Sequence, residues 1–98
     1  MGLDTIPTGI ATGVAGSLLG ARVVNNVPAN GTLVLLPGIY VLVAMGLNVS
    51  YQVQDDAGGW NNVVAINTAA PLIYSDGTNF RFNNAAGAIQ TATTIKIG

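Results

Sequence analysis

The pattern of apolar and polar residues is most regular between residues 71 and 97. Asp76 and Gly77 supply the two positive-φ positions of a type I′ hairpin turn, and residues 84–87 mark a second turn. The strand that follows alternates strictly, which predicts one face on the core and one polar face. Its two faces are Ile89, Thr91, Thr93, Ile95 and Ile97, and Gln90, Ala92, Thr94 and Lys96. We therefore expect a three-stranded β-meander here.

Apolar runs and alternation predict further short strands in the first two thirds of the chain. Residues 32–36 and 39–44 are apolar almost throughout, which is typical of strands buried on both faces or covered by another subunit. Glycine and proline around them leave too little length for a helix. Residues 55–59 have the composition of a hairpin loop. The strands expected before residue 71 are 18–24, 32–36, 39–44, 48–54 and 60–66.

This succession of about eight short strands, separated by turn residues, predicts an all-β fold. The expected architecture is a small antiparallel β-sandwich or barrel-like domain with an extended apolar N-terminal arm. We assign residues 1–24 to the arm and a first short strand, and residues 25–98 to the β-sandwich domain. A chain of this length allows one domain with a modest core, which partner chains would help to stabilise.

The arm is predicted from residues 5–21, which are uncharged, apolar and rich in glycine. A membrane helix would need roughly 20 apolar residues and is interrupted by Pro7. A free amphipathic helix is disfavoured by the glycines, at about 1 kcal/mol each. We favour an extended segment that becomes ordered by contact with a neighbouring surface. Its candidate contact residues are Ile6, Ile10, Val14, Leu18 and Leu19.

Charge is unusually sparse. Half of the residues are hydrophobic, only 7% are charged, and the net charge is -1, whereas soluble domains carry about 25% charged residues. Such a chain offers no basic patch for nucleic acid and no polybasic run for an anionic membrane. Its surface is also weakly protected against association. We therefore expect the chain to work as a homo-oligomer or in an assembly with other subunits, and not with nucleic acid or a membrane.

The residue types that usually carry out catalysis are largely missing. Histidine, cysteine and glutamate are absent, so general acid–base and nucleophilic chemistry near neutral pH lack their common side chains. We expect no enzyme, no catalytic residue and no cofactor. Asp55 and Asp56, before Gly58 and Gly59, could offer carboxylates to calcium, but the ligand set is too small. A solvated β-turn is the preferred interpretation, and no metal site is predicted.

Aromatic residues are the remaining candidates for binding. Phe80 and Phe82 alternate with polar neighbours and share one face, which we assign to the core. Trp60 directly follows a Gly-Gly turn, and we expect it, rather than the phenylalanines, to be partly exposed. Tryptophan and arginine are enriched among the anchors of interfaces. The candidate interface residues of the domain are Trp60, Arg81, Leu35 and Tyr40.

Three segments after the uncharged arm have a characteristic sequence: LPGIYVL at 36–42, Gly-Gly-Trp at 58–60 and SDGTNFRFNNAAGA at 75–88. Together they resemble small β-rich virion structural proteins of tailed bacteriophages, most of all capsid cement (decoration) proteins. The resemblance implies a non-enzymatic protein, commonly a homotrimer, that bridges neighbouring major capsid protein subunits and stabilises the shell. It also implies a place on the outer surface of the virion capsid, after assembly in the host cytoplasm.

An alternative function is carbohydrate binding by a module associated with a phage tail or fibre. Trp60 and the tyrosines would provide stacking surfaces, and asparagine amides would provide hydrogen bonds. A membrane-acting protein is a more distant third possibility.

Overall fold

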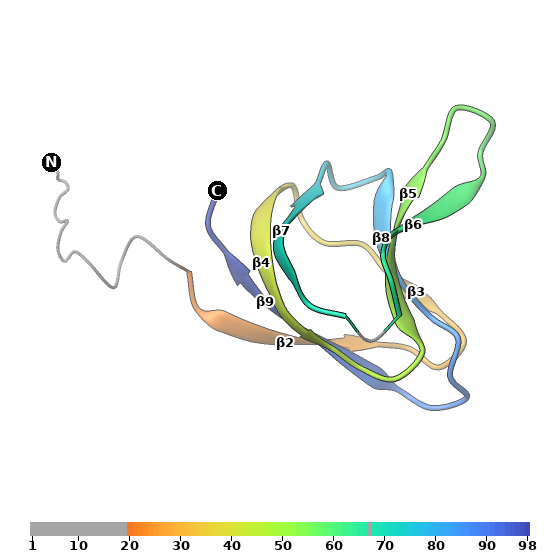
Figure 1. The fold of residues 1–98 in the computed structure, drawn as a ribbon, viewed down its shortest axis with the longest axis horizontal. Coiled ribbons are helices and arrows are strands. Elements are labelled where there is room, and N and C mark those ends of the chain that lie inside the picture. The colour runs from red at the N-terminus through yellow and green to blue at the C-terminus, as the bar shows by residue number, and fades with distance from the viewer. Residues whose placement is uncertain (1–19, 67) are drawn as a thin grey trace, which may run out of the picture.

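The computed structural model describes residues 20–66 and 68–98, which form two antiparallel four-stranded sheets and contain no helix (Figure 1). The expected all-β sandwich is therefore confirmed. The first sheet has the order β2-β9-β4-β7 and the second has the order β3-β8-β5-β6. The strands are β2 (Arg22–Val27), β3 (Thr32–Leu33), β4 (Gly38–Met45), β5 (Val49–Gln54), β6 (Trp60–Val64), β7 (Ala70–Ser75), β8 (Phe80–Asn84) and β9 (Gln90–Lys96).

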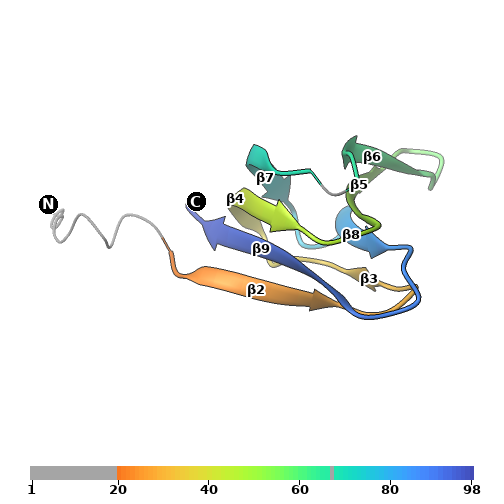
Figure 2. The same cartoon turned by 60° about the horizontal axis from the view of Figure 1, so that its bottom comes forward.

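The strand order is that of a jelly roll, in which two Greek keys wrap around one core. Every connection between consecutive strands passes from one sheet to the other, except the β5–β6 hairpin. Figure 2 shows the two layers, with β2 and β9 running side by side although they lie at opposite ends of the described chain. The sequence indicated the sandwich but did not indicate this wrapping.

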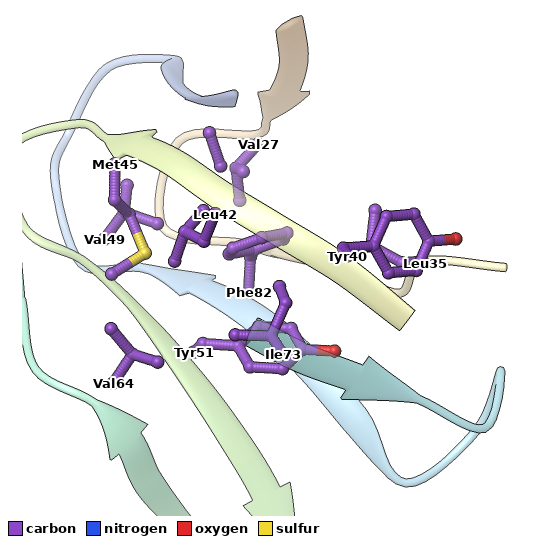
Figure 3. Packing of buried hydrophobic residues seen from close by; sticks show 11 residues of the cluster. Val27, Leu35, Tyr40, Leu42, Met45, Val49, Tyr51, Val64, Ile73 and Phe82 are labelled. Atoms are coloured by element: carbon purple, nitrogen blue, oxygen red, sulfur yellow. The ribbon is translucent and has the colours of Figure 1, made fainter. Parts of the chain in front are cut away.

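Both sheets contribute large side chains to one hydrophobic core (Figure 3). The second sheet supplies its aromatic centre: the ring centroids of Tyr51 and Phe82 are 4.8 Å apart, and Phe80 packs against them from the same face of β8. This confirms that the two phenylalanines belong to the core face. The fully or nearly fully buried residues are Val27, Leu35, Tyr40, Leu42, Met45, Val49, Tyr51, Val64, Ile73, Phe82 and Ala92.

The predicted β-meander is wrong. Strands β7 and β9 lie in the first sheet, whereas β8 lies in the second, between β3 and β5. The connection at Asp76 is a corner between sheets: its carboxylate accepts hydrogen bonds from the backbone N–H groups of Thr78 and Asn79, at 2.9 and 2.7 Å. These bonds lower the pKa of Asp76, that from Asn79 most. Turn residues therefore set the local bend, but they do not decide which strands pair.

The faces of β9 also differ from the simplest expectation, because the polar face is the one that points into the core. Ala92 and Thr94 are 0 and 2% exposed. The Asn25 side chain donates hydrogen bonds to the Ala92 carbonyl (2.9 Å) and to the Thr94 hydroxyl (3.0 Å), so the buried threonine is satisfied. The isoleucine face looks outward but is only partly exposed: Thr93 on this face is 8% exposed, Ile95 is partly buried, and Ile89, just before the strand, is 66% exposed.

The first strand lies further along the chain than expected, whereas the sandwich begins before residue 25. The strand predicted at 18–24 is β2, which runs from Arg22 to Val27 and pairs with β9 along its whole length. The expected boundary at residue 24 thus falls inside a strand of the sandwich. Strand β3 has only two residues instead of the expected 32–36. Beyond it, side chains take the place of a neighbouring strand: Ser75 donates a hydrogen bond to the Leu35 carbonyl and Tyr40 to the Leu36 carbonyl.

Candidate binding surfaces

Four side chains on the outer face of the second sheet form a polar platform: Trp60, Arg81, Gln52 and Asn62. Strand register brings them together, because Gln52 lies opposite both Arg81 on β8 and Asn62 on β6. The Arg81 guanidinium carbon lies 3.9 Å from the centre of the Trp60 ring. The Arg81 Nε donates to Gln52 Oε1 at 2.9 Å, and Gln52 Nε2 donates to Asn62 Oδ1 at 3.1 Å. The platform is therefore a connected set of planar groups.

The arrangement fixes the orientation of Arg81. Stacking on an indole and an Nε hydrogen bond both restrict rotation of the guanidinium, and its terminal N–H groups retain the fork geometry that fits a carboxylate. The side chain is partly buried, so this ordering is achieved without removing it from solvent. The platform can bind a planar or hydroxyl-rich ligand by stacking and hydrogen bonding, but it contains no general acid or base that works near neutral pH.

The loop beside the platform is held by Asp55. Its carboxylate accepts hydrogen bonds from the Gly59 N–H (2.8 Å), the Ala57 N–H (3.0 Å) and the Asn61 side chain (3.1 Å). These bonds lower the pKa of Asp55, that from Asn61 most. A Cβ on Gly59 would approach Asp55 Oδ2 to 2.9 Å, so a larger residue there would have to displace the carboxylate. Both carboxylate oxygens thus accept hydrogen bonds inside the turn.

A second surface is the outer apolar face of the first sheet, which we define by Val24, Ile39, Leu72, Val41 and Ile95. Val24, Ile39 and Leu72 are 58, 42 and 60% exposed, and the other two are partly buried. Val41 and Ile95 are register partners on β4 and β9, and Leu72 lies on β7. On β2, Arg22 lies opposite Ile95, and Val24 lies opposite Thr93. The face therefore extends across all four strands and is mainly aliphatic, with the exposed Arg22 at its β2 edge.

A third feature is the side pocket, a cavity of about 300 Å³ between the first sheet and the segment after β3. One wall comes from the inward sides of β2, β9 and β4, and the other from residues 33–36. The pocket exists because β3 ends after two residues and leaves this end of the first sheet without a facing strand. The lining residues are Val23, Asn25, Leu33, Val34, Leu35, Leu36, Tyr40, Thr94 and Lys96.

The predicted contact residues of the domain differ in their positions and exposure. Trp60 and Arg81 are brought into direct contact, whereas Leu35 and Tyr40 are 7 and 6% exposed and belong to the core. The expectation that Leu35 and Tyr40 contact a partner is thus not supported by their positions; both line the floor of the side pocket. Gln52 and Asn62 were not singled out from the sequence, because only the strand register reveals them. The predicted arm contacts Ile6, Ile10, Val14, Leu18 and Leu19 lie outside the described residues.

The titratable side chains of the described residues do not gather into one site, and two of the tyrosines are hydrogen-bonded to backbone carbonyls. Within residues 20–66 and 68–98, no three acidic, histidine or cysteine side chains come together as a metal site would require. Burial raises the pKa of Tyr51 to about 12, and its hydroxyl donates to the Tyr74 carbonyl at 2.8 Å. Burial also raises the pKa of Tyr40. The same part of the chain contains no helix that could span a membrane.

Comparisons with family models, with curated proteins and with solved structures found no match to this chain.

Proposed function

We propose that this protein is a non-enzymatic structural protein that binds a viral capsid shell and bridges neighbouring major capsid protein subunits, as a cement or decoration protein does. The observation that carries the proposal is the outer apolar face of the first sheet. Contiguous exposed apolar surface is typical of interaction sites in soluble proteins, and the chain has few charges with which to keep such a face from associating.

Burial on a neighbouring subunit would supply the binding energy. Apolar area removed from water contributes about 25 cal/mol per Å², so a face of a few hundred Å² contributes several kcal/mol before the costs of association. Repetition over a shell multiplies this contribution. The jelly-roll order is also found in viral capsid domains, although fold alone does not define function. In this proposal the protein acts as a trimer on the outer surface of the virion and is assembled in the host cytoplasm.

Binding to shells tests the proposal. The purified protein should bind saturably to capsid shells prepared without it and raise their melting temperature. Leu72→Lys should weaken this binding by about tenfold or more, because a charge replaces a contact worth about 1–2 kcal/mol. Sedimentation of shells with labelled protein measures the binding of the unsubstituted protein and of the variant. Thermal denaturation of the shells measures their melting temperature, and light scattering of the free protein tests for a trimer.

The matched control is Val63→Lys, which changes an apolar residue of similar exposure (54%) on the second sheet. It should bind as the unsubstituted protein does. Absence of saturable binding, or equal weakening by the two substitutions, would rule out the first sheet as the surface that contacts the shell.

The polar platform favours a second candidate, a tail- or fibre-associated module that binds host carbohydrate. Tryptophan, arginine and side-chain amides on one face are the groups with which proteins stack on and hydrogen-bond to sugars. In a glycan-binding assay, Trp60→Ala should abolish binding, while Tyr74→Ala, which removes another exposed aromatic residue outside the platform, should not. No binding to any glycan at high protein concentration would exclude this candidate.

A further inference from the structure

The side pocket is an incomplete part of the core. Its floor, which includes Leu35 and Tyr40, is buried, but the apolar side chains at its rim are not: Val23, Val34 and Leu36 are 48, 43 and 78% exposed. The contents of a sandwich are normally covered by side chains of the facing sheet. Here the facing strand is too short, so a cavity of about 300 Å³ opens at the surface, with a mainly apolar lining that also includes Asn25, Thr94 and Lys96.

The chain enters the sandwich beside this pocket. The Gly20 N–H donates a hydrogen bond to the Lys96 carbonyl at 2.9 Å, and Lys96 itself lines the pocket. A Cβ on Gly20 would lie 2.7 Å from that carbonyl oxygen, so a glycine is needed for this approach. The nineteen residues before Gly20 are thus attached at the rim of the pocket, and extended chain covers about 3.3–3.6 Å per residue. A few residues suffice to reach any part of it.

The sequence of this segment suits an apolar groove. Large apolar side chains occur at every fourth position, Ile6, Ile10, Val14 and Leu18. Successive side chains of an extended chain point to opposite sides, so these four share one face. The other face is mostly glycine, alanine and serine, with nothing bulky from Gly9 to Ser17. An extended segment of this kind can bury the large side chains of one face, while the other face carries only small side chains.

We propose that the side pocket binds residues 5–15 of the same chain in an extended conformation, with the side chains of Ile10 and Val14 filling it. Gly16, Ser17 and Gly20 provide the residues for the reversal that returns the segment to β2. Among the described strands β2 lies at the edge of its sheet, so its outer backbone groups could pair with the returning segment. The tether gives the segment an effective concentration in the millimolar range, which favours the same chain over a second copy. The proposal is independent of the proposed function.

Paramagnetic broadening in the full-length protein tests it. Ala11→Cys introduces a single thiol into a chain without cysteine, on the face of the segment that carries only small side chains, and a nitroxide is attached there. In dilute methyl-labelled protein, we expect the methyl signals of Val23, Val34 and Leu36 to lose several-fold more intensity than that of Leu72, which lies at the opposite edge of the sheet. Leu36→Asp should remove this difference.

The matched control is Leu72→Asp, which changes a leucine that is also mostly exposed (60%) but lies away from the pocket, and should leave the broadening intact. Unchanged methyl signals of Leu42 and Val49 show that each variant remains folded. Uniform broadening of all exposed methyls, or broadening that persists in Leu36→Asp, overturns the proposal. Broadening that occurs only between spin-labelled and methyl-labelled molecules in a mixture overturns it in favour of a second copy as the occupant.

Discussion

Phe82→Ala is expected to lower the free energy of unfolding by about 3–5 kcal/mol, the range for removing a fully buried phenylalanine. Phe82 is 0% exposed, lies on a central strand of the second sheet and packs on the Tyr51 ring. Domains of this size have a total stability of about 5–15 kcal/mol, so the substitution removes a large share of it. Urea denaturation followed by far-UV circular dichroism measures the change.

The matched control is Phe80→Ala, two residues earlier on the same face of β8. Phe80 is only partly buried and lies at the margin of the core, so its loss should cost clearly less. Phe82→Leu retains most of the buried volume and provides a measurable intermediate value if the alanine variant does not fold. Equal losses for the two alanine variants would contradict the position of Phe82 at the centre of the core.

Asn84→Asp is expected to cost about 3 kcal/mol at pH 7, although it changes the size of the side chain very little. Asn84 is 1% exposed, and its Nδ2 lies 3.1, 3.0 and 2.9 Å from the carbonyl oxygens of Val27, Pro28 and Ala88. A carboxylate there faces carbonyl oxygens and donates nothing, and each buried group left without a partner costs about 1–3 kcal/mol.

The cost should depend on pH. Burial and the surrounding carbonyls disfavour the charged form, so the pKa of the new carboxyl rises in the folded state above its usual value of about 3.9. A raised folded-state pKa means that the variant is least impaired below about pH 4 and loses stability as the pH rises through the folded-state value. Urea midpoints at a series of pH values, taken as the difference from the unsubstituted protein, measure this dependence.

The comparison with the unsubstituted protein is needed because its own stability depends on pH with the opposite sign. Hydrogen bonds in their turns lower the pKa of Asp55 and Asp76, so their contribution is present above about pH 4 and is lost as the pH falls. Asn83→Asp is the matched control: Asn83 precedes Asn84 and is only partly buried. A deficit in Asn84→Asp that does not change with pH would show that the side chain is not enclosed by carbonyl groups.

Local sequence signals predicted the strands whose neighbours are also close in sequence. The β5–β6 hairpin is the example: Val49 and Tyr51 are buried as alternation indicated, and Gln54 pairs with Trp60 across the expected loop. Both partners lie within one short stretch, so the turn between them is enough to define the pairing.

The pairings that the sequence did not reveal are set by distant residues. The sequence predicts a type I′ hairpin turn at Asp76 and Gly77, but of the two only Gly77 has a positive φ (85°), and the chain turns a corner between the sheets here. The inward face of β9 is likewise chosen by its neighbours. Asn25 satisfies Thr94 from β2, which allows the polar face to be buried and the isoleucine face to remain outside.

The candidate surfaces could likewise be predicted only in part from the sequence. The side-chain types of Trp60 and Arg81 identified them as contact residues, but their stacking and the participation of Gln52 and Asn62 depend on the register of three strands. The side pocket depends on β3 ending early, and the carbonyls of Leu35 and Leu36 beyond it accept hydrogen bonds from Ser75 and Tyr40. No pattern within residues 32–36 indicates this.

The pairing of β2 with β9 determines when the protein can fold during synthesis. Among the described strands, β9 is the only neighbour of β2 in its sheet, so this pairing cannot form until β9 has left the ribosome. Such long-range closure is slow because its entropic cost precedes any gain from contacts. Meanwhile the nascent chain exposes apolar strands with unpaired edges, the state in which β-rich chains aggregate. The interval before β9 pairs with β2 is therefore the stage at which we expect this chain to be most prone to aggregate.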